Sequence, residues 1–386
     1  MRQPRCDMGE LLILRPAKPK VSFVVPCYKL AHLLTECTHS ILAQSYDNFE
    51  ILIMDDCSPD NTPEVARSFR DPRVVHVRNN PNLGHLRNYN KGIEMARGDY
   101  IWLISADDRL RRNDALERYV SAMDRHPNAG FAFCPGMALQ DGRETRLLDY
   151  SCIAGHDQVF KGHDLFRKLL TGNCILAAAG MVRRSCYDKI GMFPLDLPFS
   201  GDWYLWLMFS LHFDAVYLAA PMVNYRYHDM AMSNTLVQQD VTICSSNDLV
   251  LLWRIHDYVA QLGDRQLLLD CVDALGSHYG DHLACKEYRA GARAGLTLAE
   301  FEDSLAQRPN DGLRRRIRAK AYTMAADRFY WKEQYPEALE FYRRALQQAF
   351  WAPAIWAKYL LLRSGPLGNY LRETNIRLKH LIGHAR

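Results

Sequence analysis

Two aspartate pairs follow apolar runs in the first third of this 386-residue sequence: Asp55-Asp56 comes after FEILIM, and Asp107-Asp108 comes after YIWLI. Divalent cations such as Mg²⁺ and Mn²⁺ bind one or two carboxylates together with phosphate oxygens and water. A cation held in this way stabilises the charge of a departing diphosphate. The pairs supply the carboxylates that such chemistry needs, but Asp-Asp pairs are common, and Asp107-Asp108 considered alone is better explained by a turn that caps a helix near Asn113–Met123.

The composition is that of a globular protein, with 48% apolar and 24% charged residues. A net charge of +4 is too small to indicate nucleic-acid binding. The 11 cysteines form no CxxC pair, which predicts reduced thiols in a cytosol-like compartment and no zinc site. The first residues lack the apolar core of a signal peptide, and the best candidate for a membrane span, Trp203–Val223, is interrupted by His212 and Asp214, so we expect no membrane crossing.

Positive charge is concentrated near the C-terminus, where residues 311–386 contain 15 Lys and Arg against 6 Asp and Glu. A solvated helical surface explains this excess, and contact with an anionic lipid or an anionic acceptor is the alternative. We expect a cytoplasmic protein; the alternative would place it peripherally at the cytoplasmic face of the inner membrane.

The elements that position the aspartates alternate along the chain. Apolar runs at Val21–Pro26, Phe49–Met54, Val74–Val77 and Tyr100–Ile104 predict strands, and the segments between them have helical spacing. This alternation predicts an α/β fold with a parallel-rich sheet. Both acidic pairs then leave the same edge of the sheet, where open α/β sheets bind ligands.

Asp202 is a further candidate, because it stands at the head of an apolar helix expected over Trp203–Phe209; a plain helix cap is the alternative. After about residue 240, helical periodicity dominates. Residues 319–346 resemble one tetratricopeptide-type helical hairpin, and a generic helical bundle explains them equally well.

Six segments occur in the order found in the family 2 glycosyltransferases, whose catalytic domain has the GT-A fold. They are VSFVVPCYK (21–29), EILIMDDCSPDNT (50–62), NNPNLGHLRNYNKGIEMARGDYIWLISADD (79–108), GMVRRSCYDKIGMF (180–193), GDWYLWL (201–207) and YRYH (225–228). The chain thus resembles this family from about residue 20 to 232. The resemblance implies a GT-A mixed sheet flanked by helices at 20–235, preceded by an extension at 1–19 and followed by an all-α domain at 236–386.

The resemblance also implies how the residues act on a nucleotide-diphosphosugar. His228 and Asp107 would hold Mn²⁺ or Mg²⁺, with Ser105 and Asp108 supporting the loop. The donor nucleotide would be bound by Pro26, Tyr28, Asp55, Asp56, Arg87 and Ala106. Arg183 and Arg184 are candidates for contact with the acceptor or the diphosphate, and we expect at least one of them to be only a surface charge.

This sequence departs from the family at two positions. Ser105 stands where family members usually have the first aspartate of Asp-x-Asp-Asp, which leaves Asp107 as the main carboxylate anchor of the metal. Gly201 replaces the glutamate of the Glu-Asp motif, whereas Asp202 keeps the position of the general base. One base and a metal-stabilised leaving group imply a single, inverting displacement, in contrast to the two carboxylates that glycosidases need.

The predicted function is therefore an inverting glycosyltransferase that moves one sugar, from a UDP-sugar or related donor, to a hydroxyl of a glycan or lipid-linked acceptor. A weakened transferase-like domain that acts as a binding scaffold is the alternative, because of Ser105 and Gly201. A dinucleotide-dependent oxidoreductase is excluded, since no GxGxxG follows the first strand. We expect acceptor contacts in the helical region and in loops such as Ala138–Phe160; the sugar, the linkage and the oligomeric state stay open.

Overall fold

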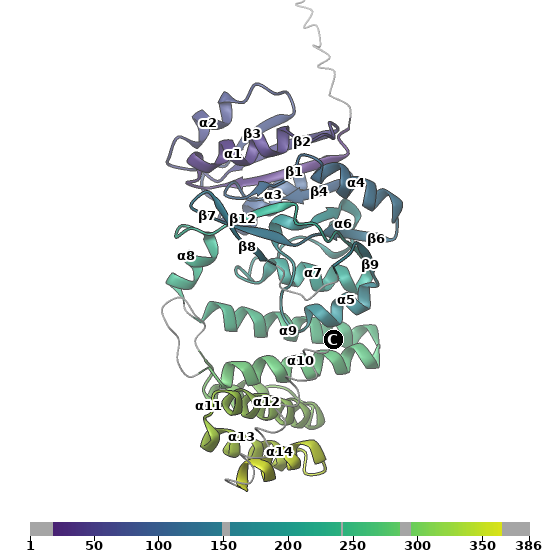
Figure 1. Ribbon diagram of the computed structural model, residues 1–386, viewed down its shortest axis with the longest axis vertical. Coiled ribbons are helices and arrows are strands. Elements are labelled where there is room, and N and C mark those ends of the chain that lie inside the picture. The colour runs from purple at the N-terminus through teal and green to yellow at the C-terminus, as the bar shows by residue number, and fades with distance from the viewer. Residues whose placement is uncertain (1–17, 149–154, 241, 286–294, 365–386) are drawn as a thin grey trace, which may run out of the picture.

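The computed structural model describes residues 18–148, 155–240, 242–285 and 295–364. Most of the expected N-terminal extension and the part of the basic segment after residue 364 lie outside the described residues. Sheets with flanking helices form one end of an elongated molecule, and a stack of helices forms the other (Figure 1). The helical character expected after residue 240 is confirmed for the described residues.

The larger sheet has eight strands and is mixed. Parallel pairing joins β1 to β2 and β4, and β2 to β3, as expected for the first hundred residues. A later strand, β10, runs antiparallel between β4 and β6. In spatial order the strands are β3 (Val74–Arg78), β2 (Phe49–Asp55), β1 (Val21–Cys27), β4 (Tyr100–Leu103), β10 (Met181–Arg183), β6 (Ala129–Phe133), β11 (Asp214–Tyr217) and β9 (Gln158–Phe160).

Helices cover both faces of this sheet, which explains why its central strands read as continuous apolar runs. Phe23 and Val25 face a core shared with α1 and α4, whereas Val24 and Met54 face a core shared with α3 and α7. The helices of this part are α1 (Ala31–Leu42), α2 (Thr62–Ser68), α3 (His85–Met95), α4 (Ala115–Arg125), α5 (Gly162–Leu169), α6 (Arg184–Ile190) and α7 (Gly201–His212).

A second sheet of four strands lies beside the first, in the order β5 (Arg109–Leu110), β12 (Val223–Arg226), β7 (Gly136–Gln140) and β8 (Arg143–Leu148). The interpretation of residues 138–160 as loops is wrong in part, because β7 and β8 form a hairpin there. Its two-residue turn, Asp141-Gly142, has φ angles of 49° and 74°. An Asp-Gly pair suits this turn, because both central residues of a type I′ turn need positive φ.

The helical region continues the core of the first part. Its helices are α8 (Met232–Gln239), α9 (Ile243–Leu262), α10 (Arg265–Leu283), α11 (Leu298–Ala306), α12 (Asp311–Trp331), α13 (Tyr335–Gln348) and α14 (Pro353–Arg363). One buried apolar cluster runs from β2 and α3 through α7 into α9, α10, α12 and α13. The α9 helix lies along the side of α7 (Figure 1). Among the described residues, no helix combines the length and the apolar character that a bilayer crossing needs.

The start of β4 requires glycine at position 98. A Cβ atom at Gly98 would lie 2.6 Å from Ser22 N and 2.9 Å from Tyr100 O. The Gly98 N–H donates to Ser22 Oγ at 2.8 Å, and Ser22 Oγ in turn donates to Glu50 Oε1 at 2.6 Å. The close approach of these backbones therefore ties β1, β2 and β4 together.

We predict that Gly98→Ala lowers the free energy of unfolding by about 1–3 kcal/mol, because the added methyl group forces backbones apart. Gly312→Ala is the matched control: Gly312 is exposed in the first turn of α12, and alanine should be neutral or stabilising by up to about 1 kcal/mol. Urea denaturation of both variants measures the difference. Equal stability of the two variants would contradict the close approach at Gly98.

Candidate active site

A cavity of about 530 Å³ opens at the edge where β1, β2 and β4 end. Its volume is within the range typical of small-molecule sites, about 300–1,000 Å³. Its walls combine these strand ends with α3 and with the segment that leads into α8. Lining residues that matter below are Pro26, Tyr28, Asp56, His85, Asn88, Tyr89, Ser105, Asp107, Met230 and Met232.

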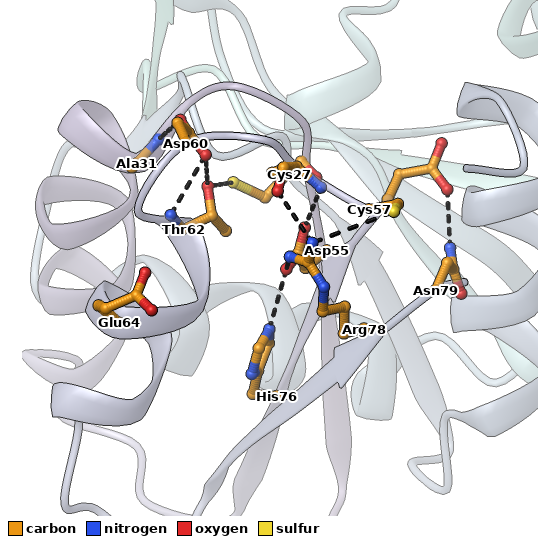
Figure 2. A network of polar contacts seen from close by, with 12 residues as sticks. Cys27, Ala31, Asp55, Cys57, Asp60, Thr62, Glu64, His76, Arg78 and Asn79 are labelled. Atoms are coloured by element: carbon orange, nitrogen blue, oxygen red, sulfur yellow. Dashed lines mark hydrogen bonds and ion pairs between the residues drawn. The ribbon is translucent and has the colours of Figure 1, made fainter. Parts of the chain in front are cut away.

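Asp55, the last residue of β2, is fully buried and is held by a network of its own (Figure 2). One carboxylate oxygen accepts a 2.6 Å bond from Arg78 and lies 3.3 Å from His76 Nε2, and the other accepts the Ser58 N–H at 2.8 Å. A buried carboxylate needs such partners, since an unpaired charge in the interior is costly. The structure thus assigns Asp55 to fixing the strand end, and it is not among the described residues that line the cavity.

Asp56 does line the cavity, and it shapes the loop that leads into α3. Its carboxylate accepts the N–H groups of Leu83 and Gly84 at 2.8 and 2.9 Å. The side-chain amide of Asn79, which is labelled in Figure 2, donates to Asp56 and also to Asn88. Two strand ends and the start of α3 are therefore joined through one buried carboxylate.

Asp107 follows β4 and lies against His228, which follows β12. Asp107 Oδ2 is 2.9 Å from His228 Nε2, although 121 residues separate them in the sequence. Burial acts to raise the pKa of Asp107, but hydrogen bonds with His228 and Ser105 outweigh it and lower the pKa. The carboxylate is thus kept ionised. Its other oxygen, Oδ1, is buried and has no hydrogen-bond partner in the described part of the chain.

Asp108 and Arg226 hold this pair together. Asp108 Oδ1 accepts the Arg226 N–H at 2.9 Å, and the Arg226 guanidinium donates to the Asp107 carbonyl oxygen at 2.8 Å. Burial and the neighbouring charge of Asp107 raise the pKa of Asp108 well above its usual value. Asp108 therefore links the loop after β4 to β12. The role of Arg226 was missed, although Arg226 is the second residue of the YRYH segment.

Asp202 stands in the first turn of α7 and is partly buried. Burial raises its pKa to about 6, and the charge of Asp248 adds to this; the Trp203 N–H and the Asn173 amide act in the opposite direction. The Asn173 bond to Asp202 Oδ2 is 3.0 Å long. Nothing in the sequence around Asn173 pointed to this contact, since it depends on how α5 and α7 pack.

Tyr89 connects the two catalytic candidates. It lines the cavity from α3, and burial, followed by the charges of Asp107 and Asp202, raises its pKa. Both carboxylates therefore act electrostatically on the same side chain.

Eight predicted site residues are not among the described residues that line the cavity: Asp55, Asp108, Asp202 and His228, whose contacts are given above, and Arg87, Ala106, Arg183 and Arg184. Arg87 is exposed on α3, and Ala106 is buried, with its N–H donating to the Pro26 carbonyl. Arg183 and Arg184 are wrong as acceptor or diphosphate contacts: Arg183 reaches Tyr100 Oη and Arg184 reaches the Gly98 carbonyl. Both arginines lie at the amino end of β4, because β10 runs antiparallel to it.

The donor set around Asp107 fits a divalent metal of the Mg²⁺ or Mn²⁺ kind. Asp107 and His228 converge, and the unpartnered Oδ1 is an ionised oxygen that a cation would satisfy. Among the described residues, no group of three or more His, Cys, Asp and Glu could enclose a metal. Mg²⁺ sites usually use one or two carboxylates and leave the other positions to phosphates and water, which agrees with this open arrangement.

The family model described as Glycosyl transferase family 2 matches residues 22–191. The chain is 29% identical over 269 residues to MT1568 of Mycobacterium tuberculosis, covering 65% of this chain and 80% of that protein. It is 29% identical over 227 residues to RT0329, an uncharacterized glycosyltransferase of Rickettsia typhi, covering 57% of this chain and 68% of the relative.

Among solved structures, the fold is similar to that of residues 1–349 of TarS from S. aureus. The TM-score is 0.56 at 15% sequence identity, over 86% of this chain and 91% of TarS 1–349. Complexes of TarS 1–349 with UDP and with UDP-GlcNAc give TM-scores of 0.54 and 0.53. At such low identity the likeness establishes the fold alone.

We predict that Asn79→Ala destabilises the protein by about 2–3 kcal/mol, because the buried Asp56 carboxylate and the Asn88 amide both lose a partner. Asn82→Ala is the control: Asn82 is exposed and donates to the Asp56 carbonyl oxygen, so its loss should cost about 1 kcal/mol or less. Urea denaturation measures both. Similar costs for the two variants would show that Asn79 is not the junction of this network.

Proposed function

We propose that this enzyme transfers one sugar from a UDP-sugar to a hydroxyl of a glycan or lipid-linked acceptor, a proposal supported by the match of residues 22–191 to the family model described as Glycosyl transferase family 2. The transfer inverts the anomeric centre and is assisted by a divalent metal. The observation that carries the proposal is the Asp107 carboxylate, which is kept ionised at the cavity wall with one buried oxygen left unpartnered.

The donor assignment rests on the lining of the cavity. Tyr28 exposes 45% of its surface there and offers an aromatic face on which a nucleotide base can stack. Pro26 and Asp56 lie on the same wall, so we assign direct nucleotide contact to Pro26, Tyr28 and Asp56. TarS 1–349 forms complexes with UDP and with UDP-GlcNAc, which favours a uridine nucleotide for this similar fold.

Asp107 and His228 would hold the metal, which when bound would offset the negative charge of the departing diphosphate. Ser105 takes the place of a second acidic residue. Its hydrogen bond helps to keep Asp107 ionised, so the serine supports the remaining carboxylate without adding a charge.

Asp202 is the general base. Its pKa of about 6 leaves it ionised at neutral pH and basic enough to accept the proton of an acceptor hydroxyl. As the acceptor oxygen bonds to the anomeric carbon, the bond from that carbon to the diphosphate oxygen breaks and the proton moves to Asp202. The nucleoside diphosphate leaves from the opposite face, so the configuration inverts.

Docking of the basic C-terminal segment on an anionic membrane remains a prediction, as does the cytoplasmic location. Within the described residues, Arg316, Arg318 and Arg328 pair with Asp273, Glu302 and Asp281, which lie outside that segment. These pairs neutralise part of the local excess of positive charge. They favour a structural role for many of these arginines over a role in membrane contact.

We predict that UDP or UDP-GlcNAc with Mn²⁺ raises the melting temperature, and that Asp107→Ala abolishes the Mn²⁺-dependent part of the increase. A ligand at about 100 times its Kd adds about 2.7 kcal/mol of stability, which a thermal-shift assay resolves. Asp114→Ala, which removes a surface carboxylate paired with Arg112, should keep the full increase. An undiminished Mn²⁺ effect in Asp107→Ala would remove this residue from the metal site.

Turnover should depend on pH through Asp202. A carboxyl whose pKa is raised to about 6 is a base above that pH and is protonated below it. We therefore expect kcat/KM to be flat above about pH 7 and to fall about tenfold per unit below pH 6. Asp202→Asn should lower kcat by about 10²–10⁴-fold and flatten this profile. A variant that keeps the wild-type acid limb would show that another group is the base.

A further inference from the structure

The segment that precedes the base is held by the helical region. Ser200 is the residue before α7, where a serine hydroxyl commonly caps the helix. Here the hydroxyl donates to Asp248 Oδ1 of α9 at 2.9 Å. Asn247, the residue before Asp248 in α9, holds the same segment: its Oδ1 accepts the Phe199 N–H at 2.9 Å.

These contacts are buried. Ser200 and Asp248 are each 3% exposed and Asn247 is 8% exposed, so water cannot replace the bonds at little cost. The Ser200 carbonyl accepts the Tyr204 N–H at 3.0 Å, which makes Ser200 part of the first turn of α7. A shift of Ser200 would therefore shift that turn, and Asp202 lies in it.

The same segment is also joined to the donor cavity. His85, which lines the cavity from α3, has its Nε2 3.0 Å from the Pro198 carbonyl oxygen. Residues 198–200 thus form a short bridge between the cavity wall on one side and α9 on the other. The position of Asp202 relative to the donor depends on both ends of this bridge.

Gly201 contributes to this arrangement. It is buried, and a Cβ atom there would lie 3.3 Å from Phe193 Cδ1. A glutamate at this position, as the family motif has, would need Phe193 to move. Gly201 has no side chain that could anchor the start of α7. The buried hydrogen bonds with Asn247 and Asp248 of α9 instead hold Phe199 and Ser200 in place.

We propose that Asn247 and Asp248 are positioning residues for the transfer reaction: through Phe199 and Ser200 they fix the first turn of α7 and thereby place Asp202. The helical region is then part of the catalytic apparatus and not an attached binding module. This inference rests on the proposed function of Asp202 as the base.

Asp248 acts on Asp202 electrostatically as well as through Ser200. The groups that face Asp202 are Asp248 from α9, Tyr89 from α3, and two neutral donors, the Asn173 amide and the Trp203 N–H. Of these, Asp248 is the one whose negative charge raises the pKa of Asp202. The substitution Asp248→Asn removes the charge but keeps an oxygen that can accept the Ser200 hydroxyl, so it separates the electrostatic effect on Asp202 from the positioning effect through Ser200.

The test compares Ser200→Ala, Asp248→Ala and Asp248→Asn in the full chain, with Arg254→Ala as the control. Arg254 also joins α9 to the preceding segment, through an ion pair with Asp196, but that pair is exposed. A panel of UDP-sugars and GDP-mannose is first screened by thermal shift. The rate of hydrolysis of UDP-GlcNAc, or of whichever nucleotide sugar gives the largest shift, then yields kcat and KM. Hydrogen exchange of the 199–207 peptide measures the order of the turn without any donor.

We expect Ser200→Ala and Asp248→Ala each to lower kcat about 10–100-fold with KM for the donor and UDP binding nearly unchanged, as for a misplaced catalytic group. The double variant should have a kcat little lower than either single variant, because both substitutions remove the same hydrogen bond. Asp248→Asn should restore most of kcat at pH 8 and move the acid limb of the profile to lower pH. Exchange at 199–207 should quicken in both alanine variants and stay at the wild-type rate in Arg254→Ala.

One result would overturn this inference and leave the proposed function intact: folded Ser200→Ala and Asp248→Ala variants with wild-type kcat, in an assay in which the separate Asp202→Asn variant is inactive. An equal loss in Arg254→Ala would also overturn it, because the effect would then belong to general packing. Wild-type turnover in Asp202→Asn would instead remove the base, and this inference with it.

Discussion

The cost of burying a carboxylate organises the site. Asp55, Asp56 and Asp108 are nearly inaccessible to water, and each is matched by donors from other elements: a guanidinium, side-chain or backbone amides, or the N–H of β12. An unpaired charge in the interior would cost several kcal/mol, so these partners have to be present for the fold to form. Asp107 is the exception, with one buried oxygen left open at the cavity.

This requirement couples distant parts of the chain. The loop after β4 is tied to β12 by Asp108 and Arg226, and that tie brings His228 to Asp107. Asp56 ties the end of β2 to the start of α3 and, through Asn79, to the end of β3. The proposed metal ligands and the proposed donor-binding wall are therefore placed by the bonds that satisfy these buried carboxyl groups.

The helical region shares this rigidity. Its core is continuous with that of α7, and its first long helix supplies polar partners to the segment before Asp202. Apolar packing alone would hold α7 against α9 but would leave the turn free to adjust by small amounts. The directional bonds from Asn247 and Asp248 restrict that freedom at Phe199 and Ser200, which precede the proposed base Asp202.

Much of the fold was predictable from local patterns. The runs at Val21–Pro26 and Tyr100–Ile104 are strands because a strand buried on both faces must be apolar throughout, and their order along the chain matched a known family. The hairpin of β7 and β8 was missed because β8 is largely exposed and polar, so only its Asp-Gly turn carried a signal. Arg183 and Arg184 were misplaced because a motif gives no strand direction, and an antiparallel β10 carries them to the opposite edge.

The sequence alone predicted the fold class, the resemblance of its first part to a glycosyltransferase family and the candidate residues for the chemistry, since these follow from periodicity and from residue types in a fixed order. Only the tertiary structure decided which of them act together. The contacts that decide this join residues tens to more than a hundred positions apart. They are the contact of Asp107 with His228, the bond from Arg78 that holds Asp55 away from the cavity, and the bond between Ser200 and Asp248 of α9. Such contacts depend on how elements pack, and the burial that sets the pKa of Asp202 exists only after they have packed.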